Sequence, residues 1–149
     1  MKKTYHGSCQ CGAVRFSANL DLAPEGERSE PTREGPWWTS TRRCNCSSCL
    51  KTRFWKIFVP PEDFSLLSGE EALTEYRFGD GGIRHLFCRH CGVHPFASAD
   101  FDIMGGPFHA VNIVCLDDAS DEELAGAPVI YEDGRHDAWD RPPAVTGFL

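Results

Sequence analysis

The chain has 149 residues, a formal net charge of −7, 41% hydrophobic residues and 25% charged residues. This composition is ordinary for a globular protein, and the length suits one domain with its own core rather than two. The acidic balance argues against a nucleic-acid partner, whose backbone carries charge of the same sign. We therefore expect a single soluble domain over residues 1–149.

The sequence carries no pattern typical of export or of a membrane span. Met1-Lys2-Lys3 is basic, but no apolar run of about 7–15 residues follows it. No stretch approaches the roughly 18 apolar residues that cross a bilayer. We expect a cytoplasmic protein with no membrane partner. Because thiols stay reduced in that compartment, we expect its eight cysteines to bind metal rather than to form disulfides.

The first expected element is a pair of short strands within residues 4–18, joined by a turn that carries Cys9, Cys11 and Gly12. Cys9 and Cys11 are two positions apart, so their side chains leave the same face of an extended backbone. Two sulfurs on a tetrahedral zinc ion lie about 3.8 Å apart, given Zn–S bonds of about 2.3 Å. Gly12 lets the backbone bend, so this pair can reach that separation.

Residues 19–36 are rich in proline, glycine and charge, and we expect them to form a surface loop. The simplest interpretation is a tolerated insertion. The alternative is a loop that contributes specificity to a nearby site. It leads into Trp37 and Trp38, which we expect to anchor the core or the loop.

The next stretch places three cysteines within six positions, at Cys44, Cys46 and Cys49. The first two repeat the two-apart spacing and the last two enclose a two-residue loop, so all three side chains can converge. After Cys49 the pattern predicts a short turn of helix and then a strand that ends at Val59, before two prolines.

Residues 61–69 are expected to be a connector and a turn. Alternation over residues 73–78, a glycine-rich turn and residues 83–87 then predict a β-hairpin. The hairpin leads directly into Cys88-Arg89-His90-Cys91-Gly92. Such a pair alone fits either a zinc site or a redox dithiol, but a redox pair is expected before a long helix, and strands flank this one. Zinc is therefore the favoured interpretation.

Two further strands are expected at residues 93–99 and 108–116, separated by a loop at 100–107. Cys115 lies in the second, largely apolar strand and is expected to be a buried side chain rather than a ligand. Ser120 and Glu123 form a capping box that predicts one short helix. Residues 129–131 fit a last strand and residues 133–149 an extended tail. The whole pattern indicates a mainly β protein with one or two short helices.

The cysteines thus divide into groups of four, three and one. Cys9, Cys11, Cys88 and Cys91 supply the four thiolates of a closed structural zinc site. Cys44, Cys46 and Cys49 supply three ligands to a second zinc ion, whose open position would take water or an external thiolate. The alternative is that a further side chain completes this second site and makes it structural. The candidates for that role are His6, His85, His94, His109 and Asp100.

Basic residues gather around the three-cysteine motif, at Arg42, Arg43, Lys51, Arg53 and Lys56. They favour the binding of a small anion, or they offset the negative charge of metal-bound thiolates, and the two roles are compatible. We expect Arg43, Lys51 or Arg53 to hold a carboxylate of the substrate.

Three motifs and a short fourth follow one another along the chain. They are His6-Gly7-Ser8-Cys9-Gln10-Cys11-Gly12-Ala13-Val14-Arg15-Phe16, Cys44-Asn45-Cys46-Ser47-Ser48-Cys49, Phe87-Cys88-Arg89-His90-Cys91-Gly92 and Leu116-Asp117-Asp118. Their order and residue types resemble the glutathione-dependent formaldehyde-activating enzyme family, which centromere protein V shares.

The resemblance implies a β-tent fold of small antiparallel sheets, one structural and one catalytic zinc ion on the two cysteine groups, and carbon–sulfur lyase chemistry. In that chemistry glutathione and formaldehyde are joined as S-hydroxymethylglutathione. Asn45 stands where the family commonly has histidine, and Leu50 where it commonly has a basic residue. The loop at residues 19–36 also looks longer than usual. The competing hypothesis is a non-enzymatic protein-binding module that zinc only stabilises.

Overall fold

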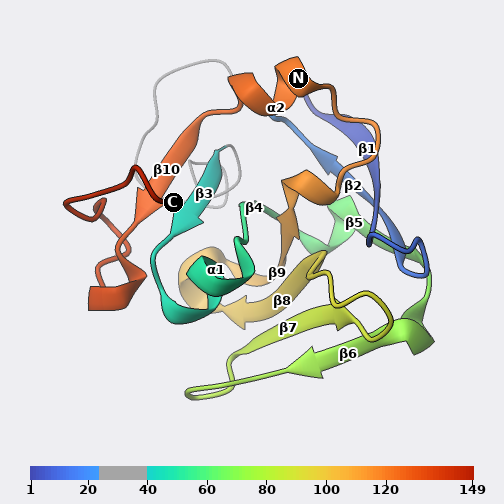
Figure 1. Ribbon diagram of the computed structural model, residues 1–149, viewed down its shortest axis with the longest axis horizontal. Helices are drawn as coiled ribbons and strands as arrows, with labels where there is room; N and C mark the ends of the chain where they lie inside the picture. The colour runs from blue at the N-terminus through green and yellow to red at the C-terminus, as the bar shows by residue number, and fades with distance from the viewer. Residues whose placement is uncertain (24–39) are drawn as a thin grey trace.

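The computed structural model describes residues 1–23 and 40–149, and within them it is mainly β, with two sheets and two short α-helices (Figure 1). The predicted fold class is confirmed. Most of the loop predicted at 19–36, together with Trp37 and Trp38, lies outside the described residues. Within the described residues, no helix has the length and apolar character needed to cross a membrane.

The smaller sheet has three antiparallel strands in the order β1-β2-β5. They are β1 (Lys3–Ser8), β2 (Arg15–Leu20) and β5 (Phe64–Ser68). Buried and less buried residues alternate along β2, with Phe16, Ala18 and Leu20 on the buried side. The alternation shows that one face of this sheet covers the core.

The larger sheet has seven strands in the order β10-β3-β4-β9-β8-β7-β6, all antiparallel except for the parallel pair β10 and β3. The strands are β3 (Thr41–Cys44), β4 (Lys56–Val59), β6 (Leu73–Tyr76), β7 (Ile83–Cys88), β8 (Phe96–Phe101), β9 (Gly106–Asn112) and β10 (Val129–Glu132). The helices are α1 (Ser47–Thr52) and α2 (Asp121–Gly126).

The main core lies between the two sheets. Phe16 of β2, Phe64 of β5 and Phe96 of β8 meet there with ring centroids 4.7–5.8 Å apart. Gly7 of β1 allows a close approach, because a Cβ at this position would lie 2.3 Å from the Phe16 ring. Burial of these rings holds the smaller sheet against the larger one.

The opposite face of the larger sheet carries buried polar side chains, among them those of Lys56 and His85. Strand pairing aligns Phe58 with Ala110, Ala110 with Ala97, and Ala97 with His85, so these side chains share one face. Lys56 lies on it too, two residues before Phe58. We call this the site face. Figure 1 shows α1 lying over it, between β3 and β8.

Several expected elements occur as predicted. The two strands in residues 4–18, the hairpin of β6 and β7, the turn of helix followed by β4, the helix α2 with its capping box, and the last strand β10 are all present. The chain also contains strand β3, which the sequence pattern did not indicate.

Other boundaries differ from the expectation for identifiable reasons. Residues 64–68 form an edge strand, not a connector, because they pair with β2. The strand expected from residue 93 begins at Phe96, since Val93 closes the turn after Cys88 by accepting its main-chain N–H. β9 ends at Asn112, where Ile113–Cys115 turn as a 3-10 helix. Residues 133–149 form turns, including a 3-10 helix at Gly134–His136, rather than an extended tail.

Candidate metal centres

Two turns bring together the thiols of Cys9, Cys11, Cys88 and Cys91. The four sulfurs all lie within 4.8 Å of one another. The Sγ–Sγ distance is 3.6 Å between Cys9 and Cys11 and 3.7 Å between Cys11 and Cys88. A tetrahedral zinc ion requires about 3.8 Å. The donors and the spacing of this four-thiol cluster therefore suit a closed zinc site.

The second cluster forms where β3 meets α1. Cys44 is the last residue of β3, and Cys46 caps the N-terminus of α1 by accepting the main-chain N–H of Cys49 at 3.4 Å. The main-chain N–H of Cys46 in turn donates to Cys44 Sγ at 3.3 Å. These contacts fold the backbone so that the sulfurs of Cys44, Cys46 and Cys49 lie within 4.8 Å of one another.

The thiols of the three-thiol cluster shift one another's pKa values in opposite directions. Hydrogen bonds from the thiols of Cys44 and Cys49 lower the pKa of Cys46 to about 2. The same close contacts, with Cys44 first and Cys46 second, raise the pKa of Cys49. A dication between the three sulfurs would allow all of them to ionise, as zinc does with its cysteine ligands.

The three-thiol cluster has no fourth member among the described residues. None of their other cysteine, histidine, aspartate or glutamate side chains places a ligand atom within 4.8 Å of all three sulfurs. His6 pairs with Asp118, and His109 stacks on Phe64 on the other side of the sheet. His85 and His94 lie next to each other, with ring centroids 5.5 Å apart. None of these histidines joins the cluster of three sulfurs, although His85 lies close enough to Cys46 for the two to interact electrostatically.

Asn45 contacts the C-terminal segment through both ends of its amide group. Its amide donates to Asp133 Oδ1 at 2.6 Å, and its carbonyl oxygen accepts the main-chain N–H of Arg135 at 2.9 Å. The residue between them, Gly134, has no room for a side chain, because a Cβ there would lie 2.6 Å from Cys44 Sγ. The polar contacts of Asn45 thus position residues 133–135 against the cluster.

Beneath the cluster lies a buried group of three charges on β3, β4 and β10. Glu132 accepts a hydrogen bond from Arg42 at 2.7 Å and from Lys56 at 3.0 Å. The Lys56 ammonium also lies 3.8 Å from Cys49 Sγ. Two cations and one anion leave one positive charge facing the sulfurs. The sequence pattern had indicated Arg42 and Lys56, whereas Glu132 comes from the distant strand β10 and was missed.

The three-thiol cluster borders a cavity of about 240 Å³, which we call the first cavity. Its lining includes Cys44, Cys49, Arg43 and Arg53. Arg43 stacks on Trp55, with the guanidinium 4.0 Å from the ring centroid. The two arginines donate to main-chain carbonyl oxygens of the C-terminal segment, Arg43 to Leu149 at 2.8 Å and Arg53 to Phe148 at 2.6 Å.

Lys51, the third expected substrate-binding residue, lies elsewhere. It lines a second cavity of about 630 Å³, whose lining includes neither Arg43 nor Arg53. Among the described residues, Val114 is the one that lines both cavities. The structure therefore separates Lys51 from the two arginines, which the sequence alone did not indicate.

The model of the glutathione-dependent formaldehyde-activating enzyme family matches residues 4–133. The chain belongs to this family. The predicted resemblance is confirmed, and the matched range includes both cysteine clusters. A crystal structure of a Rhodobacter sphaeroides protein is also similar, with a TM-score of 0.60 and 26% sequence identity. That match covers 84% of this chain and 99% of the other.

Family membership connects the geometry with glutathione and formaldehyde. The family is described by its activation of formaldehyde in dependence on glutathione, which makes a small thiol the expected partner of this chain. A thiol is also a ligand that an incompletely coordinated zinc ion would accept. The three-thiol cluster beside its cavity is thus the place to examine for that chemistry.

Proposed function

We propose that this chain is an enzyme that forms or cleaves S-hydroxymethylglutathione, which makes it a carbon–sulfur lyase in type. The observation that carries the proposal is a three-thiol cluster without a fourth described ligand, beside a cavity, in a member of this family. We assign Cys44, Cys46 and Cys49 to a catalytic zinc ion, and Cys9, Cys11, Cys88 and Cys91 to a structural one.

The reaction joins two molecules without oxidation or reduction. The glutathione sulfur forms a bond to the formaldehyde carbon, and the thiol proton ends on the former carbonyl oxygen; the reverse reaction cleaves the same bond. Zinc on the three thiolates would keep one position for the glutathione sulfur and favour its ionised form. Lys56 offsets the negative charge that this sulfur adds to the cluster.

Arg43 and Arg53 suit a carboxylate of the substrate. Both guanidinium groups lie at the first cavity, and both already donate to oxygen atoms of the C-terminal segment. At Arg53 a carboxylate would replace the neutral peptide carbonyl oxygen of Phe148 with a charged acceptor, which forms stronger hydrogen bonds with arginine. We propose that substrate binding displaces these contacts of residues 148 and 149.

The test measures zinc coordination and catalysis on the same zinc-loaded protein. X-ray absorption should give about 3.5 sulfur ligands per zinc ion, the mean of a four-thiol and a three-thiol site, and about four when glutathione is added. Exchange NMR spectroscopy should show faster formation of S-hydroxymethylglutathione with wild type than without protein. Cys46→Ser should abolish that acceleration, whereas Ser47→Ala, on the same helix, should retain it.

Two results would refute the proposal. Sulfur coordination that does not respond to glutathione, together with no acceleration of adduct formation, would favour the protein-binding module. A fourth protein ligand at the three-thiol site would exclude the open position on which the proposal depends. Because both clusters need reduced thiols, we also propose the cytoplasm as the location of this chain.

A further inference from the structure

The first cavity has mainly apolar walls, which the reaction of formaldehyde does not use. Five of the nine described residues that line it are apolar, namely Leu50, Phe54, Trp55, Val114 and Leu149. Formaldehyde adds only one carbon and one hydroxyl group to a thiol. Because the gain from burial is proportional to the apolar area removed from water, so small and polar a group gains little from these walls. Their presence indicates that a more apolar group binds here.

The two aromatic walls are fixed in place. Phe54 is 4% exposed, and its ring stacks on His94 with centroids 4.2 Å apart. The indole N–H of Trp55 donates to the Thr41 hydroxyl at 2.8 Å, and the Arg43 guanidinium lies over the same indole ring. Neither ring can leave the cavity without losing these contacts. This part of the lining is therefore preformed, as in most small-molecule pockets.

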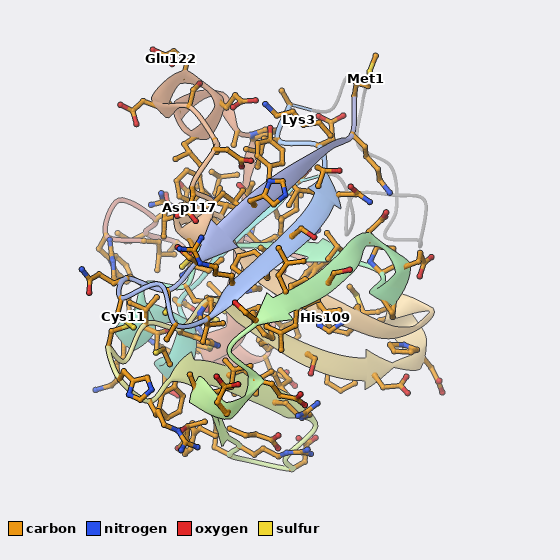
Figure 2. The ribbon with its side chains drawn as sticks, turned by 90° about the vertical axis from the view of Figure 1, so that its right-hand side faces the viewer. Met1, Lys3, Cys11, His109, Asp117 and Glu122 are labelled. Carbon is orange, nitrogen blue, oxygen red and sulfur yellow. The ribbon has the colours of Figure 1, made fainter. Side chains whose placement is uncertain are left out.

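Val114 is held at the cavity by the turn in which it lies. The main-chain N–H of Ile113, the residue before it, donates to the Trp55 carbonyl oxygen at 2.9 Å. On the other side, the main-chain N–H of Asp117 donates to the His6 carbonyl oxygen at 2.8 Å, and Figure 2 shows Asp117 beside the end of β1. Ile113 is fully buried, whereas Val114 is 56% exposed. The turn is thus anchored at both ends and leaves the valine side chain in contact with water.

Leu50 supplies a second partly exposed apolar side chain next to the three-thiol cluster. It follows Cys49 in α1, and its main-chain N–H donates to the Cys46 carbonyl oxygen at 3.0 Å. Its side chain is half-buried. Leu50 and Val114 line the same cavity as the thiols of Cys44 and Cys49. An apolar ligand group would cover both side chains and remove their surface from water.

Glutathione itself offers these walls little apolar surface. Its two carboxylates, its ammonium group and its two peptide bonds leave only short methylene segments between polar groups. In the proposed function, Arg43 and Arg53 meet one of the carboxylates, and the sulfur lies at the three-thiol cluster. The carbon chain of the aldehyde is the remaining part of the adduct that can bury apolar surface in this cavity.

We propose that the aldehyde substrates of this chain include aliphatic aldehydes longer than formaldehyde, and that Val114 and Leu50 select them. The thiol sulfur forms a bond to the aldehyde carbon and the thiol proton ends on the carbonyl oxygen, so nothing is oxidised or reduced. The alkyl group on that carbon lies against the two side chains. The cavity of about 240 Å³ also takes one end of the thiol, so we expect short chains. This inference rests on the proposed function and names the class of aldehyde.

Exchange NMR spectroscopy of the zinc-loaded protein with glutathione tests the inference. Propanal, butanal and pentanal have carbonyl groups of similar reactivity, and each rate is divided by the rate without protein. With wild type this acceleration should rise about twofold to fourfold for each added methylene group, the upper value corresponding to full burial.

Two variants and a control assign the effect to the two side chains. Val114→Thr keeps the shape of the side chain and adds a hydroxyl group, and Leu50→Asn is similar in size but polar. Each should lower the ratio of pentanal to propanal acceleration by about twofold or more. This ratio cancels any general loss of activity in a variant. Val145→Thr is the control, because Val145 is 64% exposed and does not line the cavity, and it should keep the wild-type ratio.

The possible results separate this inference from the function on which it depends. If wild type accelerates the reaction of formaldehyde but shows no rise from propanal to pentanal, the inference is wrong and the proposed function stands. A rise that both variants retain would also overturn the inference, because Val114 and Leu50 would then not select the chain. If the protein accelerates the reaction of none of these aldehydes, formaldehyde included, the proposed function fails and the inference fails with it.

Discussion

Lys56→Met removes the positive charge beneath the three-thiol cluster and should weaken metal binding there. Three thiolates and one Zn²⁺ carry one net negative charge, which the buried Lys56 ammonium faces at 3.8 Å from Cys49 Sγ. At this distance two unit charges attract by about 4 kcal/mol at an effective dielectric constant of 20. Desolvation of the ammonium offsets part of this energy. We expect a 10- to 100-fold loss of zinc affinity, as is typical when a residue that supports metal ligands is replaced.

Competition with a chromophoric chelator measures this loss. Two zinc ions should leave wild type in separate steps, and Lys56→Met should move only the weaker step. The four-thiol cluster serves as the internal reference, and Lys56→Arg, which keeps the charge, should restore most of the affinity. The variant should fold, because Arg42 and Glu132 remain paired. Unchanged zinc affinity in Lys56→Met, or equal weakening of both steps, would refute the electrostatic argument.

Three other predictions address the rest of the molecule. Cys88→Ser should unfold the protein, because structural zinc contributes on the order of 10 kcal/mol to folding. Cys46→Ser should retain the fold and lose activity. Circular dichroism and activity assays on both variants test this difference, and unfolding of both would contradict the separate roles of the two clusters. Gly134→Ala should lower zinc affinity at the three-thiol cluster, because the new Cβ would lie 2.6 Å from Cys44 Sγ and from the Trp139 ring. The chelator assay described above measures this loss. Gly147→Ala is the control, since no atom lies within 4 Å of a Cβ at that position. Burial first, and the neighbouring histidine second, lower the pKa of His94 from 6.5 to about 4, so the unfolded chain binds more protons and stability should fall as pH drops below about 6.5. The loss attributable to this group is about 1.4 kcal/mol at pH 5.5, and urea denaturation of wild type and His94→Gln should show it as a difference in pH dependence; parallel curves would contradict it.

Local patterns predicted the elements that depend on local chemistry. The capping box at Ser120 predicted α2, and cysteine spacing together with the four-ligand requirement of a closed zinc site grouped seven cysteines into the two clusters that the structure brings together. The edge strand β5 was missed because most of its residues are exposed and none is fully buried, so its pattern resembles a connector when the pairing with β2 is not known.

The remainder of the site depends on contacts between distant residues. Glu132 reaches Lys56 across 76 positions, and Asp133 reaches Asn45 across 88. No local pattern reports such pairs. The same holds for the second cavity, which gathers residues from the first motif, α1 and the end of β9. These residue types were visible in the sequence, but their proximity comes only from the order of the strands.

The four-thiol cluster also has a consequence for how the chain reaches its native topology. Its sulfurs join Cys11 to Cys88, which are 77 positions apart, whereas the three-thiol cluster spans a single short segment. A cross-link that closes so long a loop removes about 4 kcal/mol of conformational freedom from the unfolded chain, by the entropy relation used for disulfides. The short segment gains almost none of this effect. A metal ion at the four-thiol cluster would therefore bind only after distant parts of the chain have come together. A metal ion at the three-thiol cluster could bind before those long-range contacts form.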